Sequence, residues 1–306
     1  EFIEEDISVG STDNTTTYMF STDENFEYYQ ESQKKKISCV TILWMIICPV
    51  FLGNPFKSQA RTQEILGSAG TFSAFTIAIQ LILFTIMCAN GTVAPLSENS
   101  LFGPPESVLV NYGALNADRI MHCAELYRLF TAIWLNAGLF QFLLNTFGML
   151  RIGMFVEYRW GWIRYTLIYL LSGMSGGLLS LVLQPTTTSV SSSSATCGVI
   201  AAYLSEIIIT WYKTEWMQRA ISSTICLLFI GGVVLFGILD AFVDNGGTIG
   251  GVAIGAMLGC YYSLVESDFS VQIRTHLPNT ILVIITLFFV GFVILFYVFT
   301  PVPSKV

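Results

Sequence analysis

Charged residues are scarce in this chain. Only 11% of its 306 residues are Asp, Glu, Lys or Arg, and 53% are hydrophobic. Soluble domains contain about one quarter charged residues, so this composition excludes an ordinary soluble domain and indicates a membrane protein. The net charge of -7 and the lack of a basic cluster interleaved with aromatic residues also argue against nucleic acid binding.

Histidine and paired cysteines are scarce as well. The two histidines are His122 and His276, and the seven cysteines include no Cys-x-x-Cys pair. No combination of these residues has a spacing that suits zinc. The sequence therefore predicts neither a metal site nor a cofactor.

Seven apolar segments are about long enough to cross a bilayer. A helix of about 20 apolar residues spans the hydrocarbon core, and only a helix or a closed barrel satisfies its backbone hydrogen bonds there. Because the alternating pattern of barrel strands is absent, the sequence predicts an all-α, polytopic membrane helical bundle. The predicted spans are residues 71–88, 129–150, 162–183, 193–212, 221–239, 247–264 and 281–300.

Basic residues gather in the loops at one end of these spans. Cytoplasmic loops are usually richer in Lys and Arg than the loops on the other side. This pattern places the N-terminus in the cytosol and the long segment 89–127 outside the cell or in a lumen. A glycosylation sequon at Asn90 would then face the lumen. The basic loop residues are Lys57, Arg61, Arg151, Arg159, Arg164, Lys213, Arg219 and Arg274.

The N-terminal region differs from the rest in composition. Residues 1–36 are acidic and polar, which predicts a disordered cytoplasmic tail and argues against an Arg-rich mitochondrial presequence. Residues 37–69 are interpreted as an interfacial segment and linker, with an eighth span within 37–52 as the alternative. A six-helix membrane core at 70–266 and a linker with a seventh transmembrane helix at 267–306 complete the predicted organisation.

Small residues recur every fourth position in two of the spans. Such spacing places them on one face of a helix, where a neighbouring backbone approaches closely. The fourth and sixth spans are therefore expected to pack together through these faces. The small residues are Gly247, Gly251, Gly255 and Gly259 in the sixth span, and Ser194, Gly198 and Ala202 in the fourth.

Several motifs between residues 109 and 259 follow one another in a recognisable order. They are NYGALNADRI, AELYRLFTAIWLNAG, GMFVEYRWGWIRY, YLLSGMSGGLLS, SVSSSSATCG and VDNGGTIGGVAIG. Together they resemble the rhomboid family of intramembrane serine proteases, in its eukaryotic secretory type. The resemblance implies a rhomboid-like six-helix core with one added C-terminal helix. It also favours a membrane of the secretory pathway, which is the endoplasmic reticulum, the Golgi or the plasma membrane.

The resemblance places Ser193 at the position of the nucleophile and Thr248 at the position of the histidine that activates it. A serine hydroxyl is a poor nucleophile until a base takes its proton, and a threonine hydroxyl is not such a base. Neither histidine of the chain is expected to reach Ser193 in this topology. Ser191 and Ser194 replace the flanking glycines and would strain a turn that needs positive φ. A polar linker is the alternative interpretation of residues 191–194.

Other site residues are also altered. Asn136, Gln141 and Asn145 are expected on the second helix where the family has two histidines and an asparagine, so their amides either line an oxyanion site or bond a neighbouring helix. Asp244, at the mouth of the sixth helix, is expected to be solvated. By resemblance, Arg128 braces the first loop.

These features leave three hypotheses for function. The first is a rhomboid pseudoprotease that binds single-span or polytopic membrane proteins as clients in trafficking, quality control or translocation. The second is an active intramembrane serine endopeptidase that uses Ser193 and an unusual base. The third is a transporter or channel, although no ionisable residue lies deep in a predicted span and no inverted repeat is visible.

Overall fold

The computed structural model describes residues 71–91, 93–213, 216–239, 244–267 and 269–300. The predicted tail at 1–36 and the interfacial segment and linker at 37–69 lie outside these residues. Within the described part every named element is a helix, and the single β-bridge joins Leu115 to Ser189. The all-α prediction is therefore confirmed.

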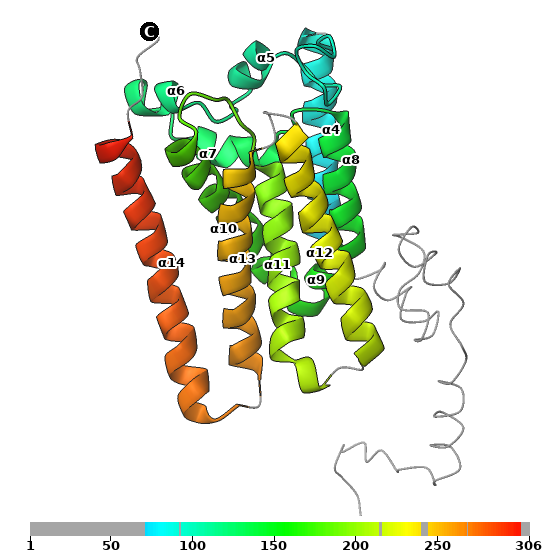
Figure 1. The fold of residues 1–306 in the computed structure, drawn as a ribbon, viewed down its shortest axis with the longest axis vertical. Helices are drawn as coiled ribbons and strands as arrows, with labels where there is room; N and C mark the ends of the chain where they lie inside the picture. Colours follow the sequence, from blue (N-terminus) through cyan, green and yellow to red (C-terminus); the bar gives the residue numbers. More distant parts are fainter. Residues whose placement is uncertain (1–70, 92, 214–215, 240–243, 268, 301–306) are drawn as a thin grey trace, which may run out of the picture. The chain divides into compact units, whose positions relative to one another are not determined.

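Within the described residues, seven helical segments are long and apolar enough to cross a membrane, and they correspond to the seven predicted spans. Because a short π-helix joins α8 to α9, these two helices form one span (Figure 1). The segments are α4 (Thr71–Gly91), α8 with η2 and α9 (Leu139–Gly148, Met149–Gly153 and Met154–Trp160), α10 (Trp162–Leu183), α11 (Ser192–Ile209), α12 (Trp216–Leu239), α13 (Asn245–Glu266) and α14 (Val271–Phe299).

Shorter helices occupy the connections. Four of them lie between α4 and α8, and the three of these that Figure 1 labels are near the end of the bundle where α11 begins. We call this end the serine end and the opposite end, where α11 finishes and α12 begins, the basic end. The short helices are α5 (Glu106–Asn111), α6 (Ala117–His122), α7 (Arg128–Thr131), η1 (Ala132–Trp134) and η3 (Trp211–Lys213).

The prediction that the second span starts at residue 129 was wrong. Leu135 has ψ 144° and Gly138 has φ -166° and ψ 173°, so the backbone is extended between η1 and α8. The helix restarts only at Leu139, and Asn136 is therefore in a connection and not on the second helix. Hydropathy alone did not reveal this break, because the residues around it are as apolar as those of the helix.

The last helix begins ten residues earlier than predicted. Helix α14 starts at Val271 and includes Arg274, His276 and Pro278, which the hydropathy pattern assigned to a linker. Proline disfavours the helix interior because it lacks an N–H group and clashes with the preceding turn. It is accommodated here in the early turns of a long helix.

Helices α11 and α13 meet through their backbones. A Cβ atom added at Gly251, Gly255 or Gly259 would overlap the carbonyl oxygen of a residue on α11. The three oxygens belong to Ser194, Gly198 and Ala202, respectively. The small faces of the fourth and sixth spans thus lie against each other.

Helix α10 joins this pair on a second glycine face of α13. A Cβ at Gly250 would lie 2.9 Å from the Ser175 carbonyl oxygen, and one at Gly176 would lie 2.5 Å from the Gly247 carbonyl oxygen. The Ser175 hydroxyl donates a 3.0 Å hydrogen bond to the Gly250 carbonyl. These close approaches leave no room for side chains between the three helices.

Helix α12 is packed far more loosely. Only 17% of its most apolar window is buried, compared with 78% for α11. A Cβ atom at Gly231 or Gly232 would meet nothing within 4 Å. This helix therefore presents most of its surface to lipid, as does α14, of whose window 11% is buried, and it has few steric restraints on lateral movement.

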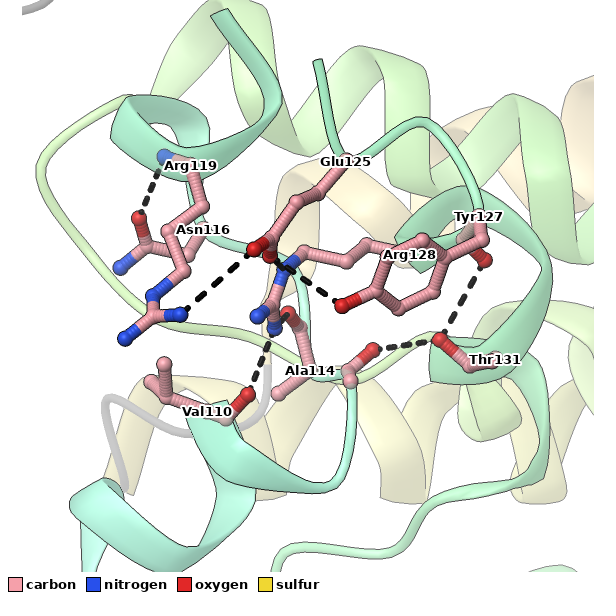
Figure 2. A network of polar contacts seen from close by, with 9 residues as sticks. Val110, Ala114, Asn116, Arg119, Glu125, Tyr127, Arg128 and Thr131 are labelled. Carbon is pink, nitrogen blue, oxygen red and sulfur yellow. Dashed lines mark hydrogen bonds and ion pairs between the residues drawn. The ribbon is translucent and has the colours of Figure 1, made fainter. Parts of the chain in front are cut away.

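Arg128 holds the first loop together at the serine end (Figure 2). Its Nη1 donates to the carbonyl oxygens of Val110, at 2.6 Å, and Ala114, at 2.9 Å. Its Nε donates to the Glu125 carboxylate at 2.5 Å, and this bond holds the pKa of Glu125 below its usual range. The pair therefore stabilises the loop above the ordinary glutamate pKa, and that contribution is lost as the pH falls through the lowered pKa.

We expect Gly255→Ala to destabilise the bundle because the new methyl group would overlap the Gly198 carbonyl oxygen. The cost should be about 1–3 kcal/mol, the usual range for overpacking. Gly232→Ala, which adds the same group to open space, should be neutral or stabilising because alanine favours a helix. Thermal unfolding in detergent measures both, and equal unfolding temperatures would contradict the close packing of α11 and α13.

We expect Arg128→Gln to destabilise the first loop. The substitution removes the hydrogen-bond donor of the Glu125 carboxylate and of the Val110 and Ala114 carbonyl groups. A buried network of this kind is worth about 3 kcal/mol when one partner is removed. Arg119→Gln is the matched control, since Arg119 pairs with the same Glu125 at 3.6 Å but is half exposed, and its loss should cost below about 1 kcal/mol. Proteolysis of the loop and thermal unfolding measure the difference between the two variants. A larger effect of Arg119→Gln would contradict the conclusion that Arg128 holds the first loop together.

Candidate active site

The four serines at 191–194 form the start of α11. Ser191 is the N-cap residue, with φ -109°, and its N–H donates to the Ala132 carbonyl at 2.9 Å. All four are buried, and Ser193 is 2% exposed. The polar-linker interpretation was therefore wrong. The expected strain is also absent, because the described non-glycine residues with positive φ are Phe102 and Ala124.

Ser193 has one hydrogen-bond partner among the described residues. Gln141 Nε2, on α8, donates to Ser193 Oγ at the long distance of 3.4 Å. The amide is oriented from its other end, where Gln141 Oε1 accepts from the Ala137 N–H at 2.8 Å. An amide that donates to the hydroxyl stabilises an oxyanion but does not remove a proton. This contact therefore supplies a donor that stabilises an oxyanion, but it does not supply the base that nucleophilic catalysis also requires.

Thr248 lies in the first turn of α13 and its hydroxyl is occupied. Thr248 Oγ1 donates to the Asp244 carbonyl oxygen at 3.1 Å, one turn earlier, and the residue is 1% exposed. The hydroxyl thus forms its hydrogen bond with the N-cap residue of its own helix. The packing of Gly251 against Ser194 brings the starts of α11 and α13 together, but no hydrogen bond joins Thr248 to Ser193 in the described structure.

Asp244 caps α13, and the prediction that it is solvated was wrong. Its carboxylate accepts from the N–H groups of Gly246 at 2.7 Å and Gly247 at 2.9 Å, and the residue is 4% exposed. Aspartate is a preferred N-cap because it satisfies the free N–H groups of a first helical turn. The motif Asp-Asn-Gly-Gly before an apolar run is the signal that would have revealed this role.

Asn136 and Asn145 bond Ser192 and not Ser193. Ser192 Oγ donates to Asn136 Oδ1 at 3.0 Å, and Asn145 Nδ2 donates to the same oxygen at 2.9 Å and to Ser192 Oγ at 3.2 Å. Of the three predicted oxyanion residues, the structure therefore brings only Gln141 to the hydroxyl of Ser193.

The polar network continues into two residues that the sequence did not single out. Asn136 Nδ2 donates to Gln80 Oε1 at 3.1 Å, and Gln80 Nε2 donates to the hydroxyl of Tyr169 at 2.9 Å. All are buried. A glutamine in the middle of the apolar segment 71–88 was the available signal, because an amide within a span needs a partner from another helix.

The space beside Ser193 is small. The cavity has a volume of about 10 Å³, measured as the space open to the centre of a water-sized sphere, which is near the minimum for one water. Side chains from α12 close it on one side. The lining residues are Gln141, Leu144, Asn145, Ser193, Val233 and Phe236.

Neither histidine contacts the site. His122 lies on α6, where its Nε2 is 3.8 Å from the Asp118 carboxylate. His276 lies on α14, near the opposite end of the bundle, and is exposed. In the described part of the chain, Ser193 therefore has no imidazole within hydrogen-bonding distance.

The comparisons with known proteins agree with this architecture. The sequence profile of the rhomboid domain matches residues 123–265. RHOMBOID-like protein 1 of Arabidopsis thaliana is 38% identical over 166 residues, which cover 54% of this chain and 42% of that protein. Inactive RHOMBOID-like protein 8 of the same plant is 34% identical over 158 residues, covering 51% of this chain and 44% of that protein.

A more complete match is found in a parasite. Rhomboid-like protease 3 of Toxoplasma gondii is 32% identical over 190 residues, which cover 62% of this chain and 68% of that protein. The chain spans about half the length, or less, of the first curated plant relatives it matches. Since the matched region contains the membrane helices from α8 to α13 and the serine tract, and since one relative at 32% identity is covered over two thirds of its length, this chain belongs to the rhomboid family.

Proposed function

We propose that this protein is a proteolytically inactive rhomboid that holds the transmembrane helices of other membrane proteins. The observation that supports the proposal is the environment of Ser193, whose hydroxyl meets an amide donor and no base among the described residues. Roles in trafficking, quality control or translocation would follow from the binding of such clients.

Inactivity follows from proton transfer. Attack on a peptide carbonyl requires that the Ser193 proton move to an acceptor as the new bond forms. Thr248 stands where a base is needed, and its hydroxyl already donates to the Asp244 carbonyl. The Asp244 carboxylate is the remaining acceptor nearby, but two backbone N–H groups occupy it. The family includes proteins named proteases and one named inactive, and this site favours the second group.

Client binding rests on the side of the cavity that α12 closes. Val233 and Phe236 of α12 separate Gln141 and Ser193 from the lipid, and α12 is the loosely packed helix beside them. If α12 moves aside, a client helix with small or polar residues gains hydrogen bonds to Gln141 and Ser193. Such bonds within a bilayer stabilise helix association by about 0.6–2 kcal/mol each.

The membrane and the orientation are part of the proposal. The basic end carries the arginines that favour a cytosolic side, so the serine end would face a lumen or the cell exterior. We propose a membrane of the secretory pathway. One relative from Arabidopsis thaliana is named as mitochondrial, which is a property of that protein.

We expect purified protein in liposomes to leave a tagged single-span substrate intact, because no base activates Ser193. Gel analysis of the tag measures cleavage, and a fluorophosphonate probe measures the reactivity of Ser193 directly. Ser193→Ala is the control, and it should be indistinguishable from the wild type in both assays. Cleavage by the wild type that Ser193→Ala abolishes would establish an active endopeptidase with an unusual base and refute the proposal.

We expect a photo-crosslinker at Val233 to capture a reconstituted single-span helix with central Gly and Ser residues several-fold more efficiently than an all-Leu helix. The reason is that only the first helix offers partners to Gln141 and Ser193. The same crosslinker at Val290, which is exposed on α14, should not discriminate between the two helices. Equal capture of both helices from Val233 would contradict a polar client site.

A further inference from the structure

Arg151 is an arginine within a membrane span that has no acidic partner among the described residues. It lies in the π-helix Met149–Gly153, close enough to Tyr203 of α11 and Cys226 of α12 to interact with them electrostatically. Its Nε is buried and has no hydrogen-bond partner in the described structure. An arginine inside a bilayer is costly unless its charge is paired, so this position calls for an anion.

The carboxylates at the basic end are engaged elsewhere. Glu157 accepts hydrogen bonds from the N–H groups of Phe72 and Ser73, at 2.8 and 2.9 Å, and so caps the start of α4. The other two form ion pairs between helices, Glu206 with Arg159 and Glu266 with Arg164. None of these contacts involves Arg151, which forms no ion pair in the described structure.

A second arginine approaches from α12. The Arg219 guanidinium lies 4.5 Å from the centre of the Trp211 ring and donates to the Trp211 carbonyl, yet its Nε is buried without a partner among the described residues. Arg219, Ser222 and Cys226 share one face of α12 by their spacing. The Tyr203 hydroxyl donates to Ser222 Oγ at 3.4 Å, which ties that face to the surroundings of Arg151.

The depth of this cluster matches a lipid headgroup. Arg219 lies about 10 Å nearer the basic end than Cys226, because seven residues of helix separate them. Trp211, Tyr212 and Trp216 surround this end with exposed rings, and Tyr212 is 97% exposed. Tryptophan and tyrosine mark the level of the headgroups in membrane proteins. Arg151 and Arg219, each with a buried Nε that has no hydrogen-bond partner in the described structure, thus lie just inside that level, where α12 meets lipid.

We propose that the phosphate of an anionic phospholipid binds at the basic end between the second span, α11 and α12, held by Arg151 and Arg219. Guanidinium groups bind phosphate through charge-assisted hydrogen bonds, which satisfy donors that have no protein partner. Basic pockets between helices on the cytoplasmic side are suited to such headgroups, and the basic residues place this end in the cytosol. The lipid would bridge α12 to the rest of the bundle.

The test compares lipids and variants. Wild-type protein in nanodiscs with phosphatidylserine should unfold at a higher temperature than in nanodiscs of phosphatidylcholine alone. In native mass spectrometry of detergent-solubilised protein, Arg151→Gln and Arg219→Gln should each weaken phosphatidylserine binding about five-fold. Arg274→Gln removes the same charge from an exposed position on α14 and should leave binding unchanged.

A further variant and a further ligand distinguish the loss of charge from misfolding, and a lipid headgroup from a soluble phosphate. Arg151→Lys keeps the charge and should retain most of the binding, which distinguishes lost recognition from a misfolded Gln variant. Equal unfolding temperatures of the wild type in both nanodiscs would overturn the proposal, as would equal losses in Arg219→Gln and Arg274→Gln. If inorganic phosphate raises the unfolding temperature in phosphatidylcholine nanodiscs as much as phosphatidylserine does, the ligand is a soluble phosphate and the lipid assignment is wrong.

Discussion

Direct contact between the backbones of α11 and α13 is the constraint on which the rest of the bundle depends. Gly251, Gly255 and Gly259 press against carbonyl groups of α11 and leave no space for a single methyl group. Within lipid there is no hydrophobic effect between helices, so close packing of this kind supplies much of the association energy. Helix α10 fits onto the same pair through Gly176 and Ser175. The three helices form a rigid unit around which α4, α8, α12 and α14 are arranged.

The rigid unit fixes the positions of Ser193 and Thr248, but it does not supply a base for the Ser193 hydroxyl. Ser193 and Thr248 stand at the starts of the two helices that pack most tightly, so their backbones are held in place. Their side chains, however, complete local hydrogen bonds, Ser193 with Gln141 and Thr248 with Asp244. A catalytic pair needs an acceptor of suitable basicity in addition to position. The two hydroxyl groups at these positions therefore form structural hydrogen bonds in the described structure.

The sequence predicted the features that arise from composition and periodicity. Long apolar runs identified seven spans, and the four-residue spacing of the glycines pointed to the contact of the fourth and sixth. The prediction failed where a single backbone torsion decides where a helix begins, or where a residue distant in the sequence decides whether a polar side chain is buried. The segment before Leu139 contains Asn136 and Gly138, but the apolar residues on either side of it hid the break that moves Asn136 off the helix. The partner of Gln80 could not be inferred either, because it depends on which helix lies opposite, whereas the cap formed by Asp244 had a local signal that the prediction missed.

The contrast between the tightly packed helices α10, α11 and α13 and the loosely packed α12 has a consequence for the evolution of such a protein. Substitutions at Ser193 or Thr248 leave the glycine contacts untouched, so they need not reduce the amount of folded protein in the membrane. Loss of peptide-bond cleavage in a lineage would then be invisible to quality-control machinery and to selection on abundance. A scaffold built in this way would outlast the loss of that activity and stay available for another use.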